Sequence, residues 1–357
     1  MAVDEASSMM ASDCNSTTLK LTSLERILRW NCDAAEMRDW RNQYEKFLLT
    51  RFNTLFAQRA EDKCLLDAFN LMPEPLAKDF LCAPGVVSIL CRRSEYAEWQ
   101  GKALAQLLLK VFANDLWLPP RNSRLTFADT NIALDIDSDF TFPDDKFGIA
   151  GTVHVEEPAL ALVLDKIDQA FNLVRAVSPR ATETVKTFID VLAIRNEPPK
   201  LAGTALHFYS STFSGYAGLV RFTNVGAENA SVEILADAFV HESIHGLLYA
   251  YEAVASPLQS ADASDIVMRS PWSGALISLP SYLQACVVWY GLFHFWKLAI
   301  STGVAVGRNV VQLSTRARGG FLKRPFSSIP SSIHGHIAPE MSQLLDGLEH
   351  HMLMQEF

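Results

Sequence analysis

Residues 270–296 contain no Asp, Glu, Lys or Arg. This stretch constrains the fold strongly, because so long an uncharged segment must lie either in a lipid bilayer or inside a protein core. Pro271, Pro280 and Gln284 interrupt the apolar sequence, and no second stretch of this kind accompanies it. We therefore predict a helix that is buried on all sides in the core, and we expect no membrane partner.

The composition indicates a large folded protein. The chain has 357 residues, of which 49% are hydrophobic and 20% charged, so it is not mainly disordered. Its 31 basic and 40 acidic residues give a net charge of −9. We expect no nucleic-acid partner, because affinity for phosphate backbones depends on Lys and Arg. The six cysteines form no CxxC pair, which is typical of reduced thiols in a cytoplasmic protein.

Hydrophobic periodicity predicts a predominantly helical α+β fold, with a small β-hairpin or sheet next to a metal-binding helix. We divide the chain into a flexible tail (1–20), an N-terminal helical region (21–145) and a metal-binding catalytic domain (146–357). Helices are expected at 39–56, 95–112, 158–177, 182–194, 279–300, 308–318 and 339–350. A short strand is expected at 148–155 and a hairpin at 204–211 and 218–225, whereas 119–145 reads as a linker or irregular loop.

The segment His241-Glu242-Ser243-Ile244-His245 is an HExxH motif, and the helical periodicity around it extends over more than twenty residues. Residues four apart lie on one face of a helix, so both imidazoles could bind one metal ion. The alternative is that both are ordinary histidines of an amphipathic helix. The predicted hairpin before the motif is a further similarity to zinc peptidases, because in many of them a strand beside the motif helix lines the substrate cleft.

Two further carboxylates are candidates for this site. Asp237 lies one turn before His241, where it could hold the far nitrogen of a ligand imidazole, although a solvated helix charge is an equal alternative. Asp265 follows His245 by twenty residues, a spacing at which gluzincin peptidases place a ligand carboxylate, so it is a candidate third ligand. Glu252 lies about 10 Å further along the helix than His245, too far to bind the same ion.

The run LADAFVHESIHGLL, the later SPW at Ser270–Trp272 and the run LQACVVWYGLFHFW resemble the HExxH-motif family of peptide-modification proteins. These proteins accompany gene clusters for ribosomal peptides and other natural products. Characterised members are iron(II)- and 2-oxoglutarate-dependent peptide β-hydroxylases. The resemblance covers about residue 204 to the C-terminus. It implies that His241 and His245 ligate the metal.

The chain departs from the family pattern after SPW. The family has an Arg and a Pro-Arg-Pro segment there, whereas this chain has SGALISLP. Where the family shows Leu-His-Gly, this chain has Leu283-Gln284-Ala285, so Gln284 becomes a candidate third ligand or pocket residue. The missing arginines leave the cosubstrate-binding residues unknown. Candidates to replace them are Arg221, Arg269, Arg316 and Arg318.

These features predict a non-haem iron-dependent oxygenase, similar to the hydroxylases, that acts on a peptide or small-molecule natural-product intermediate with Fe(II) and, as an optional cosubstrate, 2-oxoglutarate. The alternative is a zinc-dependent hydrolase or peptidase in which Glu242 is the general base. A catalytically silent relative that acts as a binding partner is the second alternative. Imidazole ligands suit both metals, so the motif does not choose between them. The oligomeric state is not predicted.

Overall fold

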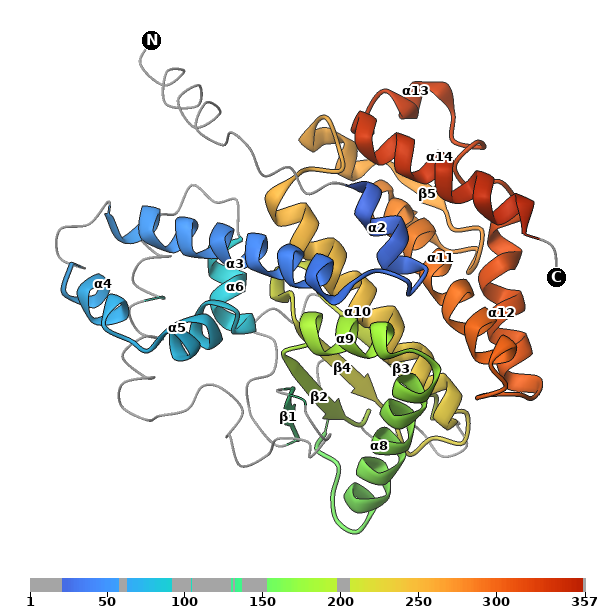
Figure 1. Ribbon diagram of the computed structural model, residues 1–357, viewed down its shortest axis with the longest axis horizontal. Helices are drawn as coiled ribbons and strands as arrows, with labels where there is room; N and C mark the ends of the chain where they lie inside the picture. The colour runs from blue at the N-terminus through green and yellow to red at the C-terminus, as the bar shows by residue number, and fades with distance from the viewer. Residues whose placement is uncertain are drawn as a thin grey trace.

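The computed structural model describes residues 21–57, 63–91, 132–136, 153–197 and 206–355, together with Leu104 and Thr130. Helices dominate the described part of the chain (Figure 1). They are α2 (Leu21–Leu28), α3 (Ala34–Ala57), α4 (Lys63–Asn70), α5 (Glu74–Leu81), α6 (Pro84–Leu90), α8 (Ala159–Val177), α9 (Pro179–Phe188), α10 (Val232–Val254), α11 (Leu279–Ser301), α12 (Arg308–Phe321), α13 (Ser331–His334) and α14 (Pro339–Met354), with the short 3-10 helices η4 (Ser214–Tyr216) and η5 (Ala261–Asp265).

Two small sheets accompany the helices. The larger one has the strand order β1 (Ala133–Asp135), β2 (Val191–Arg195), β4 (Leu219–Thr223) and β3 (Tyr209–Thr212). The first three strands are parallel, whereas β3 pairs antiparallel with β4. Every residue of β2 and β4 is buried, but the residues of β3 are half-buried. The second sheet pairs β5 (Val267–Arg269) with β6 (Leu276–Ser278). The protein is thus a predominantly helical α+β fold, as predicted.

Helix α10 is the centre of the fold, and it contacts α8, α9, α3, α11 and the edge strand β3 (Figure 1). It begins after Ser231, whose hydroxyl accepts a hydrogen bond from the backbone N–H of Ile234 at 3.3 Å. Gly246 allows it to pass close to α9, since an added Cβ atom would lie 2.6 Å from the carbonyl oxygen of Phe188. The motif helix is therefore held on several sides by packing.

Helix α11 contains most of the uncharged stretch. It begins after Ser278, whose hydroxyl caps the first turn, and Pro280 lies in that turn, where its missing N–H costs nothing. Tyr290 and Trp296 are fully buried in it. Within the described ranges, α11 is the one helix long and apolar enough to cross a membrane, and most of its apolar window is buried inside the structure. It packs as a core helix against α10, α12 and α14.

The structure confirms the helices predicted at 39–56, 158–177, 279–300, 308–318 and 339–350, and it confirms the hairpin as β3 and β4. The helix predicted at 182–194 is wrong in its second half, because α9 ends at Phe188 and the chain continues as β2. The stretch 119–145, predicted to be irregular, contains β1. The strand at 148–155 appears only as a bridge between Val153 and Asn196 in its described part.

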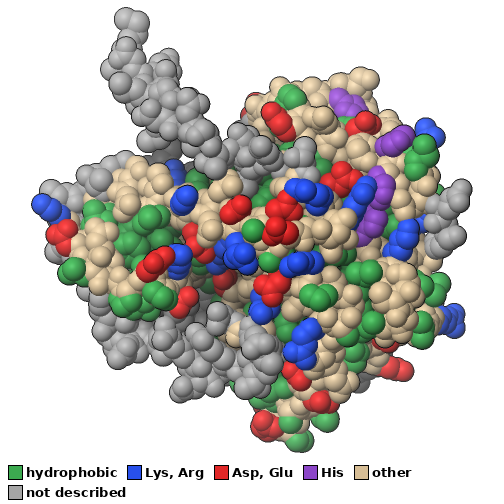
Figure 2. Space-filling view, viewed as in Figure 1, with side chains coloured by type: hydrophobic (Ala, Val, Ile, Leu, Met, Phe, Trp, Pro, Cys, Tyr) green, Lys and Arg blue, Asp and Glu red, His purple; other side chains and the backbone are tan. Residues whose placement is uncertain are grey.

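Three predictions have no test in these residues. The tail (1–20) lies outside the described residues, and so does the helix at 95–112 apart from Leu104. The boundary at 145 remains a prediction, although β1 pairs across it with β2 and one hydrophobic core extends from Leu21 to Met352. On the face shown in Figure 2, basic and acidic side chains lie interspersed over the region of α2 and α3.

Candidate metal centre on helix α10

His241 and His245 lie on one half-buried face of α10, as their spacing predicts. Their ring centroids are 5.0 Å apart. The ring of Trp289, from α11, meets His241 edge-on at 6.0 Å, and Tyr249, one turn further along α10, stacks on His245 at 6.0 Å. The two imidazoles therefore share a surface bounded by aromatic rings from two helices.

Both histidines are held in the neutral form. Burial lowers the pKa of His241 well below its usual value, and the charges of His245 and Arg316 lower it further. Burial also lowers the pKa of His245 to about 4, against a small opposing effect of its hydrogen bond to Gln284. A metal ion binds the neutral imidazole, so no proton has to leave either ring near pH 7. The donor set fits Fe(II) or Zn(II) equally in this respect.

Gln284 contacts the motif directly. Its Oε1 atom lies 2.8 Å from Nδ1 of His245, and its Nε2 atom donates a hydrogen bond to Oε1 of Glu252 at 2.7 Å. Because the amide nitrogen is committed to the carboxylate, the amide oxygen faces the imidazole and accepts from it. This leaves Nε2 of His245 with the free lone pair that a metal would need.

Glu242 is buried between the motif helix and the edge strand, with only 3% of its surface exposed. The hydroxyl of Ser210, in β3, donates a hydrogen bond to its Oε1 at 2.6 Å. Burial raises the pKa of Glu242 to about 7; the Ser210 hydrogen bond opposes this shift, and the charge of Asp237 adds to it. A carboxyl group with a pKa near neutrality can both accept and donate a proton at physiological pH.

Asp237 bonds a different partner from the one expected. Its Oδ1 atom accepts a hydrogen bond from the indole nitrogen of Trp296 at 2.6 Å. Burial raises the pKa of Asp237 to about 6, although the bond to Trp296 and the charge of Arg316 both lower it. Asp237 thus ties α10 to α11 one turn before His241, and its role toward the imidazole stays a prediction.

Asp265 is exposed at the end of η5. The structure gathers no group of three His, Cys, Asp or Glu side chains suited to a metal within residues 21–355 as far as these are described. It therefore does not bring Asp265 together with His241 and His245. Of the two candidate third ligands, Gln284 is the one that lies beside the motif.

Of the four candidate arginines, Arg316 lies at the site. It is exposed on α12, and its guanidinium carbon lies 4.8 Å from the centre of the Trp289 ring. Trp289 in turn stacks on Trp272 of the SPW segment at 5.8 Å. The remaining three have other contacts: Arg221 is buried and bonds Ser211, Arg269 bonds the carbonyl of Gly274, and Arg318 bonds the carbonyl of Gln355.

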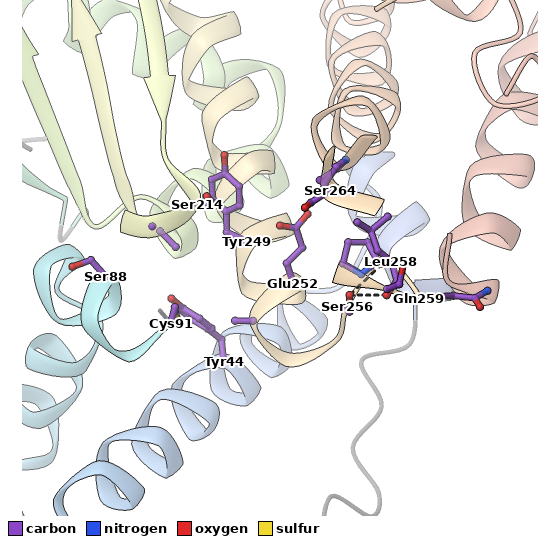
Figure 3. A pocket seen from close by; sticks show the side chains of 16 residues that line it. Tyr44, Ser88, Cys91, Ser214, Tyr249, Glu252, Ser256, Leu258, Gln259 and Ser264 are labelled. Atoms are coloured by element: carbon purple, nitrogen blue, oxygen red, sulfur yellow. Dashed lines mark hydrogen bonds between the residues drawn. The ribbon is translucent and has the colours of Figure 1, made fainter. Parts of the chain in front are cut away.

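A cavity of about 570 Å³ lies beside the end of α10 that follows the motif (Figure 3). Tyr249 and Glu252 of α10 line it. Tyr249 stacks on His245, and Glu252 is linked to His245 through the amide of Gln284. Burial raises the pKa of Glu252 to about 7, and the hydrogen bond from Gln284 opposes this. The cavity and the histidine pair therefore belong to one continuous region of α10.

Several residues of this site were missed by sequence analysis. Tyr249 follows His245 by four residues, so the same helical spacing that paired the histidines could have found it. Ser210, Trp289 and Arg316 come from three other elements, and only the fold brings them to α10.

No protein-family profile matches this chain, and no curated protein sequence matches it. The resemblance to the HExxH peptide-modification proteins therefore stays a prediction, and the proposed function is drawn from the geometry of the site.

Proposed function

We propose that the protein is an iron(II)-dependent oxygenase that hydroxylates a peptide or a peptide-like natural product. His241 and His245 are its protein ligands, and 2-oxoglutarate is its cosubstrate. The observation that supports this most is a pair of neutral imidazoles with a cation, Arg316, next to them. The charge of Arg316 is among the causes that lower the pKa of His241. In such enzymes the bound metal, the cosubstrate and dioxygen together supply the oxidising power.

Arg316 is the candidate anchor for the cosubstrate. A dicarboxylate that chelates a metal at the histidine pair has one carboxylate left to bind, and a guanidinium is the side chain best suited to it. Arg316 is exposed, and it stacks on Trp289, which meets His241 edge-on. It could therefore turn toward a bound carboxylate without giving up a buried partner.

The edge strand β3 supports a peptide substrate. It is half-buried, lies against α10 and pairs only through one edge with β4 in the described sheet. An extended peptide could add to the other edge as a further strand. Because Ser210 of this strand reaches Glu242, such a peptide would pass close to the histidine pair. Glu242 would then orient the substrate or hold a proton rather than bind the metal.

An anaerobic titration tests the proposal. Metal-free protein receives Fe(II) and then 2-oxoglutarate, and the visible charge-transfer band of the chelated cosubstrate is recorded. We expect the band in the wild type. Arg316→Gln should need at least about tenfold more 2-oxoglutarate, since a charge-assisted hydrogen bond contributes about 1.5–3 kcal/mol. Arg308→Gln, an exposed arginine at the start of the same helix, is the matched control and should behave as the wild type.

A zinc-dependent hydrolase is the second candidate, and the pKa of Glu242 favours it. A buried carboxyl group with a pKa of about 7 beside two metal-binding histidines is suited to accept the proton of a water molecule. Glu242→Gln separates the two functions. It should abolish hydrolysis of a fluorogenic peptide mixture by the zinc-loaded protein, whereas the iron charge-transfer band should persist. Iron binding without a band in the wild type would contradict the oxygenase proposal.

A further inference from the structure

The cavity next to the histidine face has an unusual lining. Among the described residues that line it, Glu252 is the only charged one, and the polar remainder consists mainly of hydroxyl groups, including those of five serines. None of these described lining residues is a lysine or an arginine. A ligand that enters it meets one carboxyl group surrounded by neutral hydrogen-bonding groups.

Glu252 has no cationic partner in the described part of the chain. Among the described residues its hydrogen bond comes from Nε2 of Gln284 at 2.7 Å, and that donor is neutral. A half-buried carboxylate without a counter-charge is costly, and a cation that reaches it recovers much of that cost. The side chain projects from α10 into the cavity, in the direction of Ser264 in the view of Figure 3.

The walls of the cavity are fixed by hydrogen bonds. On one side, the loop after α10 is tied to the segment before α14: the N–H of Gln259 donates to the carbonyl of His336 at 2.8 Å, and the N–H of Ala338 donates to the carbonyl of Pro257 at 2.9 Å. On the other side, Ser214 and Gly215 belong to η4, which begins two residues after the end of β3. A preformed pocket of this kind can select a side chain with little loss of conformational entropy.

We infer that this cavity is the subsite that recognises a positively charged group of the substrate, an ammonium or a guanidinium, with Glu252 as the specificity-determining carboxylate. That the substrate is a peptide is taken from the proposed function, and the inference rests on it in this respect. A peptide added along β3 runs toward Ser214 and Gly215, so a residue beyond the reacting one would place its basic group in the cavity. The chain Glu252–Gln284–His245 links the occupied cavity to the histidine pair.

The test measures recognition apart from metal chemistry. Full-length protein, with its metal removed by a chelator, is immobilised and incubated with a random octapeptide library, half with free and half with acetylated N-termini. Retained peptides are sequenced by mass spectrometry. We expect at least about fivefold enrichment of Lys or Arg at one position, or of free N-termini; the two halves of the library distinguish a side chain from a terminal amine.

Glu252→Gln is the decisive variant, because a glutamine can still accept the hydrogen bond from Gln284 while it lacks the charge. It should abolish the enrichment. Asp262→Asn removes an equal charge from the exposed helix η5, which borders the cavity through Ser264, and should keep the enrichment. Equal enrichment in the wild type and in Glu252→Gln, equal loss in both variants, or no enrichment of basic groups would overturn the inference. Because no metal is present, these outcomes are independent of whether His241 and His245 bind iron.

Discussion

Oε1 of Gln284 lies 2.8 Å from Nδ1 of His245 and accepts its hydrogen bond. The two residues belong to α11 and α10, and Glu252 fixes the orientation of the amide from its other end. Gln284 therefore determines which nitrogen of His245 carries the proton. It stands where the family that the sequence resembles has a histidine, and under the proposed function it would orient His245 as a metal ligand.

Gln284→Ala should weaken metal binding. Without the amide, Nδ1 of His245 loses its acceptor and the imidazole can rotate, and loss of such a supporting residue typically lowers metal affinity about 10–100-fold. Competition with a chromophoric chelator measures the dissociation constant of Fe(II) or Zn(II). Gln343→Ala, an exposed glutamine on α14, is the control and should leave the affinity unchanged. An unaltered dissociation constant in Gln284→Ala would show that the amide has no role at the site.

Gly246→Ala should destabilise the protein, against the usual preference of helices for alanine. The added Cβ atom would lie 2.6 Å from the backbone oxygen of Phe188, so α10 and α9 must move apart, at a cost of about 1–3 kcal/mol. Gly347→Ala is the matched control. It lies on an exposed face of α14 with nothing near the added atom, so it should stabilise the protein by up to about 1 kcal/mol. Urea unfolding of both variants gives the sign of each change in the free energy of unfolding. Two changes of the same sign would contradict the proposed close contact between α10 and α9.

The sequence predicted local features well. The motif helix could be found from the spacing of its apolar residues, and the β3–β4 hairpin from its β-formers and the glycines near the turn. β2 was missed because all of its residues are buried. A short, continuously apolar run that follows a helix without Gly or Pro cannot be told from a further helical turn by periodicity. The histidine pair is local in sequence, whereas Ser210, Trp289 and Arg316 reach it only through packing. Glu252 was rejected as a ligand by distance along the helix, and its link to His245 through Gln284 depends on α11.

His294 should make the protein sensitive to acid. Burial lowers the pKa of His294 to about 3, and the charges of His351, Arg29 and Lys297 add to the shift. His351 stacks on it at 5.2 Å. Because its pKa is lower in the folded state than the value of about 6.5 in the unfolded state, the stabilisation is complete above pH 6.5 and is lost as the pH falls toward 3.

His294→Phe should remove this part of the pH dependence. Between pH 7 and pH 5 the wild type should lose on the order of 1–2 kcal/mol more stability than the variant does. Urea unfolding in the presence of a chelator measures the difference. His350→Asn replaces an exposed histidine on α14, the neighbour in sequence of His351, and should keep the pH dependence of the wild type. Parallel stability curves for the wild type and His294→Phe would contradict the prediction.

The proposed function depends on His241 and His245 as the ligands of a metal ion. Its most direct test is the metal content of reconstituted protein, measured by elemental analysis after removal of loosely bound ions, for the wild type and His241→Ala, with circular dichroism to verify that both are folded. We predict about one iron per chain in the wild type and almost none in the folded variant, because a single imidazole cannot retain the ion. Equal metal content in the two folded proteins would show that His241 does not hold the ion.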